Sequence, residues 1–154
     1  AKFDFDKAKW FNHEWIKKSD VSRLQELVSL PAEVITLIKE RCTLLTDFTG
    51  QSRFFFETPD KWDLDAIKPK WNKDKHNFFL EVVRQMQMNW DPATLESQFK
   101  NLAAASNIKP GDVLLPLRIM LVGGKYGPGV FDIAGIIGKD ETVKRIQQVL
   151  TMLS

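Results

Sequence analysis

The sequence predicts an all-α protein of two packed helical subdomains, which we expect to comprise residues 1–53 and 54–154. Along most of the chain, apolar residues recur every three or four positions, the spacing of one helix face. No segment alternates apolar and polar residues as a half-buried strand does. Prolines and capping residues divide the pattern into segments of helix length. Hydrophobic residues make up 44% of the 154 residues, which is enough to form a core.

Three short helices are expected within residues 5–48. The second follows Asp20, a residue type favoured at helix N-caps. The third has Pro31 in its first turn and is expected to bury Val34, Ile35, Ile38, Cys42 and Leu45. Gly50 is expected to end the helical pattern. The first helix, over residues 6–18, carries an apolar stripe with Trp10 beside it: Ala8, Phe11, Trp15 and Ile16.

Residues 52–76 are less regular, because Pro59 and Pro69 interrupt them. Phe54 to Phe56 are expected to anchor the two bundles. The lysines of this stretch have two interpretations, a solvated linker surface or a set of phosphate contacts. The five tryptophans of the chain are expected to pack between helices rather than to stack on a ligand.

The second half of the chain predicts five further helices, one of which contains Pro116 and is expected to kink there. Capping residues and first-turn prolines mark where they begin. The helices cover, in order, residues 74–89, residues 91–106 with Asp91 as cap and Pro92 in the first turn, residues 109–123 with Pro110 in the first turn, residues 129–138, and residues 140–153 with Asp140 as cap.

The charge balance does not by itself mark a nucleic-acid binder, since the formal net charge is only +2. Residues 100–130 hold a local positive surplus, which is typical either of a solvated face or of a surface for an anion. No apolar run reaches membrane-spanning length and no leader segment is present. We therefore expect a soluble, cytoplasmic protein in a reducing compartment that contacts no membrane.

The reactive residues form no recognisable catalytic or metal-binding set. The single cysteine, Cys42, cannot form an intrachain disulfide or a zinc site, and is either a small buried hydrophobe or a nucleophile. His13 and His76 lie far apart without a paired ligand motif. We expect no metal, no cofactor and no catalytic residue in this chain, whose abrupt start indicates a piece of a longer polypeptide.

A glycine-rich stretch is the most unusual local feature. LVGGKYGPGVF, residues 121–131, holds four of the eight glycines. Its spacing fits neither G-x-G-x-x-G nor G-x-x-x-x-G-K-[ST], and Pro128 lacks the backbone N–H that a phosphate would need. The stretch is therefore not expected to hold a nucleotide.

Three blocks of the sequence match the motifs of one protein family in the same order. FDFDKAKWFNHEWI (residues 3–16) resembles F-D-x-x-K-L-x-W-x-N-x-x-Y-[IL], and IKERCTLLTDF (residues 38–48) resembles the helix that follows it. NIKPGDVLLPLRIMLVGGKYGPGVFDIAGIIGKDETVKRI (residues 107–146) resembles a block that ends in P-x-L-F-E-x-x-x-x-L-G-K-E-x-x-x-x-R-L. Together the blocks are similar to the C-terminal region of bacterial glutamyl-tRNA synthetases.

The resemblance implies an anticodon-binding helix bundle, whose two subdomains grip the anticodon stem and loop of glutamate tRNA. It covers essentially the whole chain, but the family's H-I-G-H and K-M-S-K-S signatures are absent. This fragment alone is therefore not expected to be an enzyme. Its parent is expected to be a glutamate–tRNA ligase that uses ATP and Mg²⁺ in a catalytic domain elsewhere on the same chain.

The family's base-contacting positions carry over to single residues of this sequence. Gly127, Pro128 and Val130 match the loop where anticodon bases pack against backbone and small side chains. Arg118 matches the arginine that precedes this loop. Arg41 matches the arginine implied in reading the third anticodon base, which is C in glutamate tRNAs and G in glutamine tRNAs.

Other residues are implied in contacts with the tRNA backbone or in stacking. Lys100 and Lys125 are expected at phosphates, and Tyr126 is expected to stack on a base. Two residues keep a second interpretation that needs no tRNA. Arg118 is otherwise a brace for the Pro116 kink through backbone carbonyls, and Arg41 is otherwise an exposed helix residue.

Two departures from the family pattern support an alternative function. Val122 replaces a family threonine, and Gly127 replaces the threonine or similar residue before the loop proline. With the low net charge, they favour a helical protein–protein interaction module that does not read tRNA. The hypothesis that the chain is itself a ligase has the least support, because the catalytic signatures are missing.

Overall fold

The computed structural model describes residues 4–154, and every regular element within them is a helix. The prediction of an all-α protein is therefore confirmed. The first three residues, including the Phe3 that opens the first motif, lie outside the described residues. Among the helices of residues 4–154, none is both long enough and apolar enough to cross a membrane.

The chain separates into two compact units, the first ending at Phe56 and the second running from Glu57 to Ser154. The boundary expected from the sequence, between residues 53 and 54, falls inside the last helix of the first unit. As a division into domains, that boundary stays a prediction.

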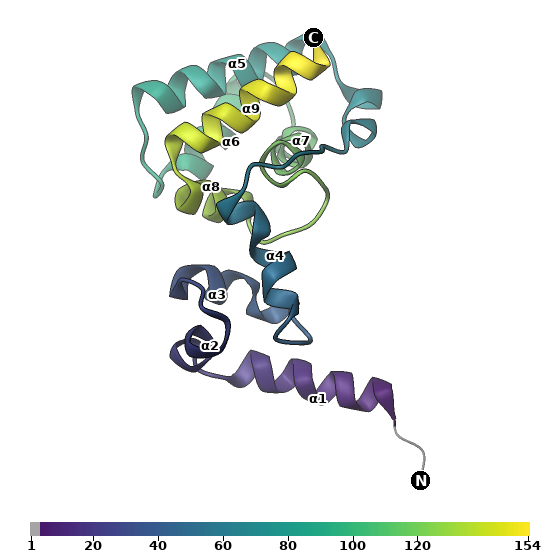
Figure 1. Ribbon diagram of the computed structural model, residues 1–154. Helices are drawn as coiled ribbons and strands as arrows, with labels where there is room; N and C mark the ends of the chain where they lie inside the picture. The colour runs from purple at the N-terminus through teal and green to yellow at the C-terminus, as the bar shows by residue number, and fades with distance from the viewer. Residues whose placement is uncertain (1–3) are drawn as a thin grey trace. The chain divides into compact units, whose positions relative to one another are not determined.

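The described part of the first unit is built from short helices (Figure 1). Asp4 caps the first of them, because its carboxylate accepts a hydrogen bond from the Lys7 N–H at 3.1 Å. Asp20 occupies the N-cap position of the second, as predicted, but its side chain makes no capping hydrogen bond. The elements are α1 (Phe5–Lys18), α2 (Val21–Val28), α3 (Ala32–Ile38), the 3₁₀ turn η1 (Lys39–Arg41) and α4 (Asp47–Phe56).

Two predictions about where the helices of this unit end are wrong. Gly50 does not end the helical pattern but lies within α4. The helix forms there because it buries Phe48, Phe54 and Phe55, which outweighs the cost of about 1 kcal/mol for a glycine in a helix. The expected third helix ends at Ile38 instead of continuing to Leu45, which is exposed.

Helix α1 is amphipathic in sequence, yet Ile16 is its one buried side chain among the described residues. The ring of His13 ties the helix to the rest of the unit, with Nδ1 3.0 Å from the Cys42 carbonyl oxygen. Trp10 and Trp15 do not pack between helices as expected but are exposed. The buried side chains of the unit come mainly from α2, α3 and α4.

The second unit places α9 alongside α5 and against α7, as the yellow, teal and green ribbons of Figure 1 show. Its core is rich in phenylalanine. The rings of Phe78 and Phe99 pack edge to face with their centroids 5.1 Å apart, and the centroids of Phe99 and Phe131 are 5.5 Å apart. The elements are η2 (Leu64–Ala66), η3 (Lys68–Lys70), α5 (Lys73–Met88), α6 (Leu95–Ala105), α7 (Pro110–Val122), α8 (Val130–Ile137) and α9 (Lys139–Leu153).

The start of α6 differs from the prediction. Asp91 and Pro92 do not begin the helix, which starts at Leu95. Asp91 instead closes a turn, since its carboxylate accepts a hydrogen bond from the Ala93 N–H at 3.1 Å. An aspartate that bonds the backbone two residues on is typical of a turn before a helix.

The cap of the last helix also differs. Gly138, with a φ of +88°, ends α8 and stands at the N-cap of α9, so Asp140 lies in the first turn instead of capping it. Helix α7 begins at Pro110 as predicted and continues through Pro116. The kink expected at Pro116 stays a prediction.

Candidate functional site

The seven residues between α7 and α8, Gly123–Gly129, form a tight loop that we term the glycine loop. Gly123 ends α7 with a φ of +94°, and Gly127 has a φ of +99°, values that other residues rarely adopt. A Cβ at Gly123 would lie 2.6 Å from the carbonyl oxygen of Lys61 and 3.3 Å from the Cβ of Pro59. Gly123 is therefore required both by its backbone conformation and by this close approach.

The side chain of Arg118 connects the tip of the glycine loop to α7. Its Nη1 atom donates to the carbonyl oxygens of Tyr126 and Gly127, both at 3.0 Å, and of Pro128, at 2.6 Å. A guanidinium group suits this task because it presents N–H donors in a fixed plane. Arg118 thus braces carbonyls of the loop, whereas the sequence suggested carbonyls near Pro116.

Tyr126 forms the exposed tip of the glycine loop. Its hydroxyl donates to the Val122 carbonyl at 3.0 Å, and a Cβ at Gly124 would lie 2.6 Å from Cε1 of its ring. The residue is nevertheless 56% exposed, and Lys125 beside it is exposed as well. The loop therefore presents to solvent an aromatic ring in a defined position, next to a positive charge.

Pro128 and Val130 face the interior. Pro128 is buried, and Val130, in the first turn of α8, is only 6% exposed. They anchor the glycine loop to the core, so its accessible surface consists mainly of Lys125, Tyr126 and Gly129. The base contacts implied for Pro128 and Val130 stay predictions.

The end of α7, which carries the glycine loop, has a separate hydrogen-bond donor for each of its last carbonyls. Helix ends ordinarily leave four carbonyls without a partner inside the helix. Here the donors come from residues 62–63, from α9 and from the loop itself. The pairs are Ile119 with the Gly123 N–H (2.8 Å), Met120 with Trp62 Nε1 (3.0 Å), Leu121 with Arg145 Nη1 (2.6 Å), Val122 with the Tyr126 hydroxyl (3.0 Å) and Gly123 with the Asp63 N–H (2.8 Å).

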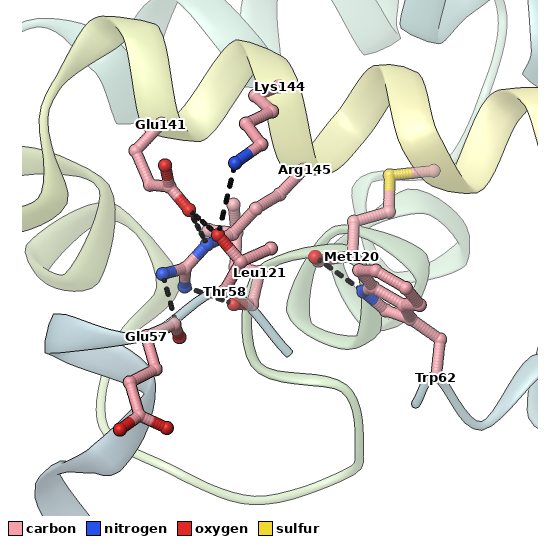
Figure 2. Close-up of polar contacts among 8 residues, drawn as sticks. All are labelled: Glu57, Thr58, Trp62, Met120, Leu121, Glu141, Lys144 and Arg145. Atoms are coloured by element: carbon pink, nitrogen blue, oxygen red, sulfur yellow. Dashed lines mark hydrogen bonds and ion pairs between the residues drawn. The ribbon is translucent and has the colours of Figure 1, made fainter. Parts of the chain in front are cut away.

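Arg145 on α9 is the central residue among these hydrogen-bond donors (Figure 2). Its side chain is 1% exposed, and each of its three nitrogens is used. Nη1 donates to Leu121, Nη2 donates to the carbonyl oxygen of Glu57 at 3.1 Å, and Nε donates to Oε1 of Glu141 at 2.9 Å. One buried guanidinium therefore joins the start of the second unit, the end of α7 and the start of α9.

Glu141 balances the charge of Arg145. The hydroxyl of Thr58 also donates to this carboxylate, and Nζ of Lys144 lies 3.5 Å from the Thr58 oxygen (Figure 2). Burial alone would raise the pKa of Glu141, but the hydrogen bonds from Thr58 and Arg145 and the nearby positive charges outweigh it. The pKa of Glu141 therefore lies below its ordinary value, and the group is ionised at neutral pH.

Two of the residues implied in tRNA contacts, Lys100 and Arg41, belong neither to the glycine loop nor to the two helices that flank it. Lys100 is exposed on α6, with Nζ 2.8 Å from Oε1 of Glu96. Arg41 is exposed at the end of η1, in the first unit. The structure thus gathers the other implied residues in and next to one loop: Arg118, Lys125, Tyr126, Gly127, Pro128 and Val130.

Cys42 is not poised for nucleophilic chemistry. The residue is buried, and burial together with the negative charge of Asp47 raises the pKa of its thiol to about 11. The thiolate is the reactive form, so this thiol is inert near neutral pH. Across residues 4–154, no three His, Cys, Asp or Glu side chains gather as ligands of a metal ion would.

Two solved structures with similar folds are a glutamate tRNA ligase and a glutamate-tRNA synthetase. A crystal structure of the glutamate tRNA ligase from Elizabethkingia meningosepticum with its amino acid matches with a TM-score of 0.91 at 28% identity, over 100% of this chain and 34% of that one. The glutamate-tRNA synthetase from Elizabethkingia anophelis matches with a TM-score of 0.82 at 27% identity, over 98% and 32%. The fold is thus similar to a helical third of two aminoacyl-tRNA synthetases.

The sequence comparisons point to the same class of protein as the solved structures. Residues 5–150 match the family described as the anticodon binding domain, and the chain belongs to this family. The glutamate–tRNA ligase of Flavobacterium johnsoniae is 36% identical over 99% of this chain, and that of Porphyromonas gingivalis is 31% identical over 99%. The chain spans about a third of the length of these curated relatives.

Proposed function

We propose that this chain is the anticodon-binding domain of a glutamate–tRNA ligase and binds the anticodon stem and loop of glutamate tRNA. The glycine loop is the observation that carries the proposal. Its backbone is held by Arg118, and the helix end that carries it is held by the hydrogen bond from Arg145 to Leu121. Tyr126 and Lys125 stay exposed. A preorganised loop with an exposed ring suits single-stranded bases, because these can leave their stack and expose their faces and edges.

The mechanism is binding rather than bond chemistry. Tyr126 stacks on a splayed base, a contact worth about 1–3 kcal/mol, and Lys125 neutralises a phosphate. Arg118 acts as a positioning residue, since its guanidinium is engaged with loop carbonyls. Lys100 contacts a stem phosphate by leaving Glu96, which costs little because an exposed ion pair is worth at most about 1 kcal/mol.

Arg41 supplies specificity for the third anticodon base. That base is C in glutamate tRNAs and G in glutamine tRNAs. The guanidinium donates to the acceptors of an unstacked C, and a wrong base leaves donors without partners, a difference of about 1–3 kcal/mol. Arg41 is exposed, as this role requires.

Ligation of glutamate takes place in the part of the parent chain outside these residues. That part supplies the site for ATP and Mg²⁺, since the family's nucleotide-binding signatures, H-I-G-H and K-M-S-K-S, do not occur in this sequence. This domain positions the tRNA and does not itself catalyse. The parent enzyme works in the cytoplasm, where tRNA is charged.

The experiment that tests the proposal is binding of the chain to glutamate tRNA, glutamine tRNA and an unrelated tRNA at two salt concentrations. Arg41→Ala is measured beside the wild type, with Arg84→Ala as the matched control, because Arg84 is also an exposed arginine. We expect preference for glutamate tRNA, a steep loss of affinity with salt, and loss of the preference in Arg41→Ala alone.

Equal binding of all three tRNAs by the wild type would contradict the proposed function. If the preference exists but Arg41→Ala retains it, anticodon reading stands and the role of Arg41 is wrong. Activation of glutamate with ATP by this chain alone would contradict its non-catalytic assignment.

A further inference from the structure

A small pocket lies in the second unit, where the start of α5 and the segment before it meet the start of α7. We term it the α5–α7 pocket. Its volume is about 80 Å³, and one water molecule needs about 10–15 Å³ of such space, so the pocket has room for a tetrahedral oxyanion. Its lining includes Ile67, Lys70, Trp71, Lys75, Gly111 and Asp112.

Lys75 is the buried cation of this pocket. The residue is 9% exposed, and its Nζ donates to the carbonyl oxygen of Lys70 at 2.6 Å. Within residues 4–154, no carboxylate oxygen lies within 4 Å of this Nζ. An ammonium group has three N–H donors, so these residues leave two donors and the charge itself without a partner. A buried charge is ordinarily paired, because burial removes it from water.

The place of Lys75 in the helix adds to this imbalance, because it lies in the first turn of α5. Asn72 caps that helix, with Oδ1 accepting from the Lys75 N–H at 2.9 Å. The start of a helix carries a partial positive charge, which disfavours a lysine there. Gly111 and Asp112 belong to the first turn of α7, so the pocket also borders the positive end of a second helix.

Asp112 offsets only part of this positive charge. It is the one carboxylate among the residues that line the pocket, against two lysines, and it is exposed, so water and salt screen it. The sequence around the pocket is also basic, since residues 68–76 contain four lysines and one aspartate. The α5–α7 pocket therefore combines a small volume with an excess of positive charge.

We propose that the α5–α7 pocket binds a phosphate group. Lys75 and Lys70 supply the charge. The N–H of Gly111 supplies a neutral donor, because no acceptor within residues 4–154 bonds it. Trp71 forms a fixed wall, since its ring stacks on that of Phe79 with the centroids 5.8 Å apart. Two charge-assisted hydrogen bonds from ammonium groups and one from a helix N-terminus are a typical phosphate environment.

The phosphate has two sources, the backbone of an RNA and the free ion. The pocket and the glycine loop lie at opposite ends of α7, whose 13 residues span about 20 Å at 1.5 Å per residue. One RNA with its anticodon at the glycine loop can therefore place a backbone phosphate at the pocket. The inference rests on the proposed function only for this first source.

Titration of the chain with inorganic phosphate, at an ionic strength held constant with chloride, tests the pocket directly. The NMR signals of the Gly111 amide and the Trp71 indole report binding. Gly111→Asp places a carboxylate at the pocket, where an added Cβ meets nothing within 4 Å and an acidic residue suits the first turn of a helix. Gly111→Asn, of nearly the same size and without the charge, is its matched control.

A second pair of variants tests the lysine. Lys70→Gln removes an exposed ammonium of the pocket, and Lys68→Gln removes an exposed ammonium of the same 3₁₀ turn that does not line it. Lys75 is kept, because its bond to the Lys70 carbonyl is part of the fold. We expect phosphate affinity to fall by about tenfold or more in Gly111→Asp and clearly in Lys70→Gln, with both controls close to wild type. Equal phosphate responses in wild type and Gly111→Asp would overturn binding of the free ion.

Binding of glutamate tRNA to the same variants over a range of salt concentrations distinguishes the two sources. If the phosphate belongs to the RNA, Gly111→Asp binds about tenfold more weakly than Gly111→Asn, and the salt dependence of Lys70→Gln is smaller by about one phosphate contact. Equal tRNA affinities with a phosphate response would assign the pocket to the free ion.

The absence of both effects would overturn the proposal. The phosphate titration needs no RNA. A wild type that fails to bind tRNA would therefore contradict the proposed function, while the titration alone would still decide whether the α5–α7 pocket binds phosphate.

Discussion

The Nη1 atom of Arg145 lies 2.6 Å from the carbonyl oxygen of Leu121, so a buried arginine on α9 supplies the donor that the end of α7 lacks. Through the same side chain, the end of α7 is joined to Glu57 and Glu141. The position of the glycine loop therefore depends on Arg145, which is distant in sequence from the exposed tip at Tyr126 and is itself buried.

Replacing Arg145 with methionine is expected to lower the free energy of unfolding by about 2–4 kcal/mol, because two carbonyls lose their donor. The Arg145→Lys variant is expected to recover a part, since an ammonium group reaches fewer acceptors. Denaturant unfolding measures both. The control is Lys144→Met, an exposed neighbour, with a change within about 0.5 kcal/mol. Equal effects at 144 and 145 would contradict the central role of Arg145.

Glu141 predicts part of the acid sensitivity of the fold. Its pKa is lowered in the folded state, so its stabilisation is fully present above the ordinary glutamate pKa of about 4.3 and is lost as the pH falls through the folded value. The Glu141→Gln variant is expected to be less stable at neutral pH and to lose less stability on acidification. Unfolding measured across this pH range checks both, with Glu96→Gln, from an exposed pair, as the control. Parallel pH curves for wild type and Glu141→Gln would refute the prediction.

Two glycines give opposite predictions for the same substitution. Gly123→Ala is expected to cost about 1–3 kcal/mol, because its φ is +94° and a Cβ would meet the Lys61 carbonyl. Gly111→Ala is expected to be neutral or to stabilise by up to about 1 kcal/mol, because Gly111 lies in the first turn of α7 with open space around it. Thermal unfolding of the two variants distinguishes them, and a similar loss in both would count against the geometry.

Arg118→Met is expected to loosen the glycine loop without unfolding the domain. The carbonyls of Tyr126, Gly127 and Pro128 lose their shared donor and turn to water. Amide hydrogen exchange is expected to accelerate at residues 124–130 and to remain unchanged in α5. Affinity for glutamate tRNA is expected to fall as well. Unchanged exchange in the loop would show that Arg118 does not position it.

Tyr126 allows its hydroxyl and its ring to be tested separately. Tyr126→Phe removes the hydrogen bond to Val122 but keeps the ring, so we expect tRNA affinity close to that of the wild type. Tyr126→Ala removes the ring as well, and we expect a loss of about 1–3 kcal/mol in binding if a base stacks there. Titration of tRNA at fixed salt measures both variants. Equal affinities for the two would mean that no base stacks on this ring.

The sequence predicts the fold class because the apolar period is helical almost throughout. It misplaces the elements where a local signal competes with burial. Gly50 is a poor helix residue, yet the phenylalanines around it hold α4 together. Asp140 is a good cap, yet Gly138 takes that position because its φ of +88° both ends α8 and begins α9.

The exposed part of the candidate site was visible in the sequence, whereas its supporting part was not. The glycine loop was evident from composition and from the resemblance. Arg145 matches the arginine of the R-L pair that ends the third family block, but the resemblance implied no role for it. It lies among buried positions of α9 such as Thr142, Ile146 and Val149, where a charge needs buried partners. Those partners are backbone carbonyls at Leu121 and Glu57, which no residue pattern identifies.

The bonds from Arg118 end on backbone oxygens, which every amino acid carries. Substitutions at Lys125 therefore leave these three bonds available, and a replacement for Tyr126 still offers its carbonyl to Arg118. Under the proposed function, natural variation at the two exposed positions can accordingly change which RNA is preferred while the bonds from Arg118 are kept. The proposed function therefore lets tRNA preference in this domain evolve separately from these three bonds.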